Sequence, residues 1–308
     1  MAPSQSQSIV RVAAVQAEPE WFDLQAGVKK TCALIAEAAE GGAQLVSFPE
    51  CFIPGYPAWI WTRSIDPELS VKYIQNSLTV DSPEMDTIRA AAAKHNINVV
   101  LGFSENDHNS LYITQATISG ATGEYHTFLQ HEEIHVGSWP ALDSFVEGDP
   151  GHWGMSRDGS HCSARQYAVE GGCFVMCTTA VTTQRGVDLM KTQNGLIYHT
   201  PGGGCSAIYG PDGRRLSKPL PETQEGLVFA DLDKSLIVGV RMLMDSCGHY
   251  SRPDMLWLGV DARERKHVDY QGAPHSRLRR VILSVKRAFI KLLTKTGRCS
   301  MKLAETTS

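Results

Sequence analysis

The stretch LVSFPECFIPGYP, residues 45–57, places a carboxylate and a thiol side by side at the end of an apolar run. A carboxylate can act as a general base, and a thiol becomes a strong nucleophile once a base removes its proton. Glu50 and Cys51 are therefore the first candidates for catalytic groups. If the backbone is extended there, adjacent side chains point to opposite faces. We therefore expect Cys51 to face away from Glu50 and not to be an attacking thiol.

The elements that must position Glu50 are a strand, a helix and a second strand. Residues 8–16 are apolar and predict a buried strand. A helix with one apolar face follows, with Asp23 as its N-cap and Gly41-Gly42 as its end. Residues 43–48 predict the next strand. Glu50 then lies just past the carboxyl end of a strand, which is the edge where ligands gather in α/β proteins.

Helices and strands alternate along the rest of the chain, which favours one α/β domain over two. We predict helices over residues 84–95, 160–170 and about 234–244, and strands over 97–105, 111–119, 134–139, 173–179 and 226–233. Residues 204–219 predict a hairpin that turns at Pro211-Asp212-Gly213. Ser160 is the expected cap of its helix. Cys162 would then lie early in the helix, where the dipole lowers a thiol pKa.

Composition excludes several classes of protein. The chain has 308 residues, of which 42% are hydrophobic and 20% charged, and this is ordinary globular composition. No apolar run is long enough to cross a bilayer, and no basic region precedes the first apolar stretch. We therefore expect a soluble cytoplasmic protein with no membrane partner. The eight cysteines form no CxxC pair and no zinc pattern, so we expect no metal and no cofactor.

The charge of the chain is uneven. Residues 275–308 carry nine Lys or Arg and one acidic residue, whereas the rest carries 20 basic and 32 acidic residues. A basic segment can bind nucleic acid, an anionic membrane or an acidic partner, but this composition favours a solvated tail. We therefore predict a folded domain over residues 1–270, a basic tail over 271–308, and no nucleic-acid partner. Salt-dependent polyanion binding by the tail is the alternative.

Five segments resemble the nitrilase branch of the carbon–nitrogen hydrolases, in the same order. They are GAQLVSFPECFIPGYP, IHVGSWP, YAVEGGCFVMCTT, GGGCSAIYGPDGR and DSCGHYSRPDML. The resemblance extends over most of residues 8–260. It implies an α/β fold, an α-β-β-α sandwich of two packed halves, which usually assembles into larger oligomers. A homo-oligomer that acts on a small-molecule nitrile or cyanide is expected.

The resemblance also implies a mechanism. A Cys thiolate attacks the nitrile carbon to give a thioimidate, a Glu acts as general base and acid, and a Lys stabilises developing charge. Water then releases a carboxylic acid, or an amide, and ammonia. Glu50 matches the catalytic glutamate of the family, with a turn-capping carboxylate as the alternative. Tyr56, Pro57 and Trp139 are expected to shape the substrate pocket, although core packing is a rival role for Tyr56 and Pro57.

The segments that carry the Lys and Cys of the family have no counterpart in this sequence. There is no lysine between Lys94 and Lys191, and no cysteine between Cys51 and Cys162. Only GATGEYHTFLQHEE separates the strand over 111–119 from the strand over 134–139. We therefore place an internal deletion of several dozen residues near Gly123-Glu124 and expect an incomplete sandwich. An incorrectly joined gene model or an alternative transcript would produce such a junction.

Other groups could replace the missing ones, but their sequence context does not favour any of them. The candidates are Cys162 in a helix, Cys173 and Cys177 in an apolar strand, Cys205 after three glycines, and the carboxylates Glu132 and Glu133. Two functions remain. One is a nitrilase-type hydrolase with Glu50 as general base. The other is a catalytically inactive paralogue or truncated isoform that only binds or co-assembles.

Overall fold

The structure is a computed structural model that describes residues 8–123, 132–148, 151–195, 197–246, 248–249, 251 and 254–255. The chain divides into two units, residues 1–252 and 253–308. All helices and strands of the described residues belong to the first unit. The basic tail over 271–308 lies outside the described residues, and the domain boundary at residue 270 stays a prediction.

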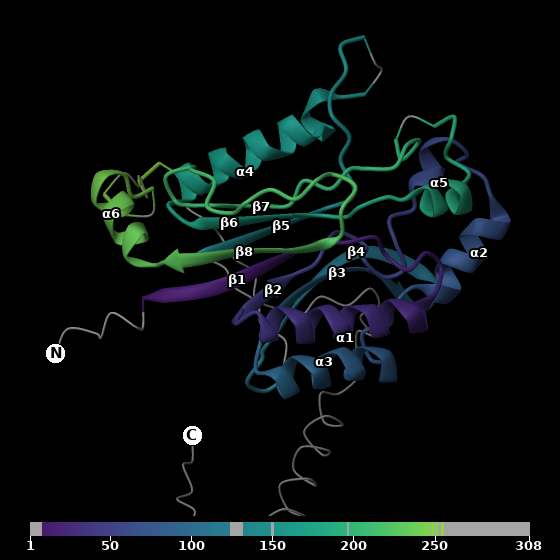
Figure 1. Ribbon diagram of the computed structural model, residues 1–308, viewed down its shortest axis with the longest axis horizontal. Coiled ribbons are helices and arrows are strands. Elements are labelled where there is room, and N and C mark those ends of the chain that lie inside the picture. Colours follow the sequence, from purple (N-terminus) through teal and green to yellow (C-terminus); the bar gives the residue numbers. More distant parts are fainter. Residues whose placement is uncertain are drawn as a thin grey trace, which may run out of the picture. The chain divides into compact units, whose positions relative to one another are not determined.

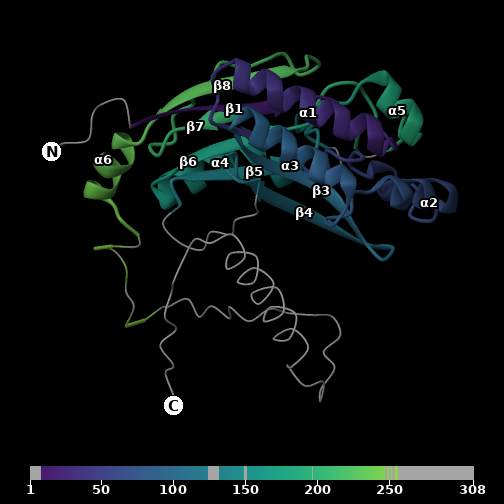
Figure 2. The ribbon, with the colours of Figure 1, turned by 90° about the horizontal axis from the view of Figure 1, so that it is seen from below.

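Five strands form the first sheet, in the order β4-β3-β2-β1-β8 (Figure 1). Their bounds are β1 (Ile9–Gln16), β2 (Leu45–Ser47), β3 (Asn98–Asp107), β4 (Ser110–Ile118) and β8 (Gly226–Asp233). The strands β1, β2 and β3 are parallel, whereas β4 and β8 add antiparallel edges. Helices α1 (Leu24–Glu40) and α3 (Pro83–His95) lie side by side on one face of this sheet (Figure 2).

Helix α1 begins and ends at the predicted residues. The Asp23 carboxylate accepts a hydrogen bond from the backbone N–H of Ala26, and Gly41 forms the C-cap. Each of these groups satisfies a backbone group that the helix end leaves unpaired. The prediction of a strand, a helix and a second strand before Glu50 is therefore confirmed.

A second sheet packs on the first and has the order β5-β6-β7. Its strands are β5 (Ile134–Trp139), β6 (Phe174–Thr179) and β7 (Ala207–Tyr209), with β5 parallel and β7 antiparallel to β6. Helix α4 (Arg157–Gly171) connects β5 to β6 and covers the outer face, and α6 (Ser235–Leu243) follows β8. The layers run α4, second sheet, first sheet, then α1 and α3 (Figure 1). The predicted α-β-β-α sandwich is confirmed.

The second sheet repeats part of the first. The series β2, α3, β3 and β4 has the same order and strand directions as β5, α4, β6 and β7. In the first sheet, β1 and α1 precede β2, and β1 pairs with β2 in parallel. Within the described residues, no strand holds the corresponding place beside β5. In the described residues, the second sheet therefore has one parallel strand fewer than the first.

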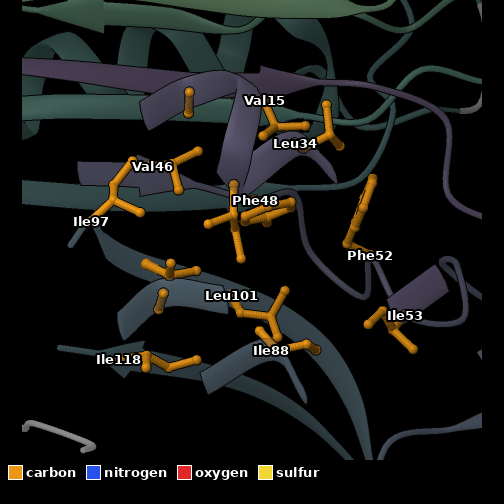
Figure 3. Packing of buried hydrophobic residues seen from close by; sticks show 14 of the residues in the cluster. Val15, Leu34, Val46, Phe48, Phe52, Ile53, Ile88, Ile97, Leu101 and Ile118 are labelled. Atoms are coloured by element: carbon orange, nitrogen blue, oxygen red, sulfur yellow. The ribbon is translucent and has the colours of Figure 1, made fainter. Parts of the chain in front are cut away.

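Two apolar clusters hold the layers together. One lies between the first sheet and its helices, and Figure 3 shows Val15, Val46 and Leu101, from three strands, together with Ile88 of α3 in this cluster. The other lies between the sheets, where Val12 and Ala14 of β1 face Phe174 and Met176 of β6. The hydroxyls of Ser47 and Thr178 also cross between the sheets, 2.6 Å apart.

Some elements differ from the predictions. Helix α4 begins after Ser156, whose hydroxyl accepts a hydrogen bond from the backbone N–H of Gly159. The prediction that Ser160 caps this helix is therefore wrong, because Ser160 is fully buried inside it. As a result Cys162 lies beyond the first turn of α4. Two further helices, α2 (Pro67–Asn76) and α5 (Gln184–Met190), were not predicted.

Candidate active site

Glu50 lies on a loop that continues from β2 along β3. The backbone N–H of Phe48 donates to the carbonyl of Val100 at 2.8 Å, and that of Phe52 donates to Gly102 at 2.9 Å. Figure 3 shows both phenylalanines pointing into the core, with their rings 5.3 Å apart. Because an anchored aromatic ring lies on each side of it in the sequence, Glu50 is held on a fixed backbone.

Two close approaches fix where the Glu50 backbone lies. Gly102 of β3 leaves room for the loop, since a Cβ atom at this position would lie 2.3 Å from the carbonyl oxygen of Pro49. On the other side, the backbone N–H of Glu50 donates to the carbonyl of Trp139 at 3.3 Å. Glu50 is therefore placed where the carboxyl ends of β2 and β5 meet.

The carboxylate of Glu50 has no partner of opposite charge among the described residues. Burial raises its pKa from 4.5 to about 7, because desolvation penalises the charged form. A carboxyl group with a pKa near neutrality can both accept and donate a proton at physiological pH. The site thus has the property that a general base and acid requires.

Cys51 is adjacent to Glu50 but is poorly suited to attack. Its φ of 49° is in the left-handed region, so the assumption of an extended backbone at this residue is wrong. Its thiol forms a hydrogen bond with the hydroxyl of Tyr73 on α2. Burial raises the thiol pKa to about 12, and the charge of Glu50 contributes to this rise. Only the thiolate is a strong nucleophile, so Cys51 is inert near pH 7.

Two stacked tyrosines lie near Glu50. The rings of Tyr56 and Tyr198 are 5.9 Å apart at 20°. Burial raises the pKa of both hydroxyls, and the charge of Glu50 raises it further. The hydroxyl of Tyr198 accepts a hydrogen bond from the backbone N–H of Ala141 at 2.7 Å. Tyr198 was missed in the sequence because it lies in a loop, where no periodic pattern marks a site residue.

The other two predicted pocket residues lie differently. Pro57 is half-buried and precedes a short 3₁₀ helix, Ala58–Trp61. Trp139 reaches Glu50 through its backbone carbonyl, whereas its ring packs on the cluster between β6 and α4 that contains Ala164. A role of Tyr56, Pro57 and Trp139 in binding substrate stays a prediction.

Comparisons with known proteins show the family to which the chain belongs. The family model described as carbon-nitrogen hydrolase matches residues 11–135 and 125–242. The chain belongs to the carbon–nitrogen hydrolase family. Among its relatives are arylacetonitrilases of Aspergillus kawachii and Aspergillus oryzae, which are 50% and 51% identical to it. Each alignment includes 85% of this chain and 94% of the relative.

Solved structures support the fold. Saccharomyces cerevisiae Nit3, described as a member of branch 10 of the nitrilase superfamily, is 18% identical, with a TM-score of 0.56 over 79% of this chain and 97% of that one. A carbon-nitrogen hydrolase from Helicobacter pylori is 14% identical, also with a TM-score of 0.56, over 77% and 93% of the two chains. The α-β-β-α arrangement is thus that of carbon–nitrogen hydrolases.

The remaining thiols of this carbon–nitrogen hydrolase are not paired with Glu50 in the described residues. Cys162 is exposed on α4. Cys173 and Cys177 are fully buried, as predicted, and burial raises the pKa of both. Cys205 is also buried, and its charged neighbours are arginines and an aspartate at the start of α4 and after β7. Cys247 and Cys299 lie outside the described residues.

The spare carboxylates are engaged elsewhere. Glu132 accepts hydrogen bonds from Tyr167 and from the ring of His135, and Glu133 forms an ion pair with Lys234. These contacts lie beside α4 and α6. Within the described ranges, no three His, Cys, Asp or Glu side chains are grouped as metal ligands. No helix in the same ranges is long and apolar enough to cross a membrane.

Proposed function

We propose that this chain is a nitrilase-type hydrolase of arylacetonitriles in which Glu50 is the general base and acid. The observation that carries this proposal is the half-buried Glu50 carboxylate, whose pKa of about 7 suits proton transfer in both directions. The arylacetonitrilases that share half of its residues support the substrate class. The stacked Tyr56 and Tyr198 offer an aromatic surface beside the carboxylate.

The proton transfers follow from this pKa. Glu50 takes the proton of a thiol as the sulfur bonds to the nitrile carbon, and that proton passes to the nitrile nitrogen, which gives a thioimidate. Addition of water and loss of ammonia leave a thioester. A second water releases the carboxylic acid and restores the thiol. If the first tetrahedral intermediate expels the thiol instead of ammonia, the product is the amide.

The thiol and the lysine of this mechanism have no counterpart in the sequence. We propose that an internal deletion near Gly123-Glu124 has removed them. Two observations support this. The alignment with the Aspergillus kawachii relative runs over 311 positions but includes 85% of the 308 residues, which leaves about 50 positions of the relative without a residue opposite. The family model also matches in two pieces that overlap over residues 125–135, at the start of β5.

The second candidate function is a catalytically inactive paralogue or truncated isoform that binds or co-assembles. The specific observation in its favour is that Glu50 has neither a cation nor a thiol beside it in the described residues, apart from Cys51 with its raised pKa. We further propose a homo-oligomer, as the family resemblance implies, and a location in the cytoplasm, as the composition of the sequence suggests. Light scattering after size-exclusion chromatography measures the oligomer.

Ammonia release from phenylacetonitrile, an aliphatic nitrile and cyanide tests the function. The purified 308-residue chain is compared with Glu50→Gln and with Glu68→Gln, which changes an exposed carboxylate on α2. Turnover that disappears only in Glu50→Gln supports the hydrolase and identifies Glu50 as its base. If a folded chain releases no ammonia and forms no amide from any of the three substrates, the hydrolase is excluded and the inactive paralogue is supported.

A further inference from the structure

Among the described residues, the edge of β5 that faces away from β6 presents backbone groups without strand partners. The backbone N–H of Phe174 in β6 donates to the carbonyl of Glu133, and residues of a parallel strand bond alternately to either side. Ile134, Val136 and Ser138 therefore direct their N–H and C=O groups away from β6. Among the described residues, the contact with this edge is the side-chain amide of Gln115 on β4, 3.4 Å from the Val136 carbonyl.

An uncovered face of β4 lies next to this edge. The side chain of Gln115 points toward β5, and residues two and four positions away along a strand share its face. These are Ile113 and Leu111, which are 70% and 39% exposed. The equivalent face of β1, by contrast, is buried against β6. We call Leu111, Ile113, Gln115, Ile134, Val136 and Ser138 the β4–β5 strip.

The order of the strands along the chain indicates which kind of segment would bind to the β4–β5 strip. In the first sheet, β1 pairs in parallel with β2 and precedes it in the sequence. Its counterpart beside β5 would come from the residues just before β5. It is here that the two family-model matches overlap and that we place the roughly 50 positions present only in the relative. The β4–β5 strip therefore suits an extended segment that pairs in parallel with β5 and corresponds to the positions present only in the relative.

The direction of such a segment follows from β5. The carboxyl end of β5 lies at Glu50, because the Trp139 carbonyl accepts the hydrogen bond from the Glu50 N–H. A strand parallel to β5 would end at the same edge of the sheet. Its last residues would arrive beside a carboxylate that lacks a counter-charge among the described residues. A cation there would be attracted, since the site is partly desolvated.

We propose that the β4–β5 strip binds an extended segment of a second nitrilase-family chain, which runs parallel to β5 and brings its C-terminal residues to Glu50. This inference rests on the deletion proposed above. Main-chain hydrogen bonds to β5 supply affinity, as in other cases of strand addition. Apolar side chains of the segment cover Leu111 and Ile113. The occupant is therefore apolar at alternate positions, with a cation after its last strand residue.

The test uses a synthetic peptide that contains the roughly 50 residues of the Aspergillus kawachii arylacetonitrilase without a counterpart here. The peptide carries a fluorophore, and its anisotropy is measured against the full 308-residue chain. We expect saturable binding and a rise in Tm with peptide concentration, because a ligand that binds only the folded state stabilises it. Absence of saturable binding overturns the proposal.

Three variants assign binding to the strip. Val136→Pro removes an N–H that faces the free edge and keeps the ladder with β6. Ile113→Lys places a charge on the β4 face, and Val71→Lys is its control on an exposed part of α2. We expect about tenfold weaker binding for Val136→Pro and Ile113→Lys and no change for Val71→Lys. If Val136→Pro unfolds, Ile113→Lys alone decides. Equal binding by Ile113→Lys and Val71→Lys overturns the proposal.

Gln115→Ala tests whether removing the side chain that now contacts the β5 edge strengthens peptide binding. The Gln115 amide competes with the peptide for the Val136 carbonyl. Its removal should therefore tighten peptide binding two- to threefold, which is about the contribution of one weak hydrogen bond. A second copy of this chain is the rival occupant, and light scattering would show a dimer that Val136→Pro dissolves. A dimer that Val136→Pro dissolves and that the peptide cannot displace overturns the proposal. Peptide binding without ammonia release contradicts the hydrolase but not the strip, so the two proposals fail separately.

Discussion

The amide nitrogen of Glu50 lies 3.3 Å from the carbonyl oxygen of Trp139, and this contact joins the carboxyl ends of β2 and β5. The two strands belong to different sheets. The position of the Glu50 carboxylate thus depends on how the sheets are packed and on the loop that leaves β2. Variants that disturb either should affect the site before they affect distant parts of the fold.

Gly102→Ala should destabilise the protein through the Glu50 loop. The new methyl would lie 2.3 Å from the carbonyl oxygen of Pro49, and relief of such overpacking costs about 1–3 kcal/mol. Urea unfolding followed by circular dichroism measures the loss. Gly239→Ala in α6 is the matched control, because no atom lies within 4 Å of its new Cβ. There we expect a gain of up to about 1 kcal/mol. Equal effects of the two variants would contradict the close approach.

Glu50→Gln should raise stability more at high pH than at low pH. The pKa of Glu50 is about 7 in the folded protein and 4.5 as its model value, so between these pH values the folded state binds more protons than the unfolded state. Stability therefore falls as pH rises from 4.5 to 7. Glutamine removes this loss, so the Tm difference from the parent should be larger at pH 8.5 than at pH 5.

The control for the pH prediction is Glu68→Gln, on the exposed side of α2. Its Tm difference from the parent should be the same at both pH values. A Glu50→Gln variant that is destabilised at pH 8.5 would mean that the carboxylate is held by a favourable partner, and the account of an unpaired Glu50 would be wrong.

Tyr198→Phe should cost about 1–3 kcal/mol of unfolding free energy. The substitution leaves the backbone N–H of Ala141 without the acceptor that it has at 2.7 Å, in a partly buried position. Tyr56→Phe removes the acceptor of the Trp61 indole N–H, but this contact is exposed and water can replace it, so we expect a change within about 0.5 kcal/mol. Denaturant titration of both variants gives the comparison, and a reversed order would refute it.

Maleimide should label Cys162 within minutes in the native protein and leave Cys51 unlabelled. Cys162 is exposed on α4, whereas Cys51 is buried and its thiol pKa is raised to about 12. Digestion and mass spectrometry of the labelled protein locate the modified residues. Both sites should react after denaturation in guanidinium, which serves as the control for recovery of each peptide. Native labelling at Cys51 at the rate of Cys162 would contradict its placement.

The elements around Glu50 could be predicted because their signals are local. An alternating or continuous apolar pattern marks β1 and β2, and Asp23 and Gly41 mark the ends of α1. The start of α4 was predicted at Ser160, whereas the structure has Ser156 as the cap, and a serine at either position can cap a helix. Tertiary contacts made the choice by burying Ser160. The helix α2 had a readable signal in Asp66 and Pro67, a cap followed by proline at the first turn.

Residues of the site could be predicted only where they belong to a sequence motif. Glu50 follows from FPE at the end of a strand, but the conformation of Cys51 does not, because a left-handed φ outside glycine has no reliable sequence signal. The approach of Tyr198 to Tyr56 depends on a loop more than a hundred residues away. Such contacts are set by the packing of whole layers, which a single sequence does not reveal.

The Gln115 amide also bears on the solubility of the chain. Exposed strand edges invite edge-to-edge aggregation, and proteins usually protect them with charge, proline or a covering element. Among the described residues, one uncharged side chain, that of Gln115, contacts the β5 edge at 3.4 Å from the Val136 carbonyl. Two exposed apolar residues of β4 lie beside it. Aggregation through this edge requires two chains to meet, so it should increase with the concentration of the protein. The yield of soluble protein in cells should therefore fall as the rate of synthesis rises.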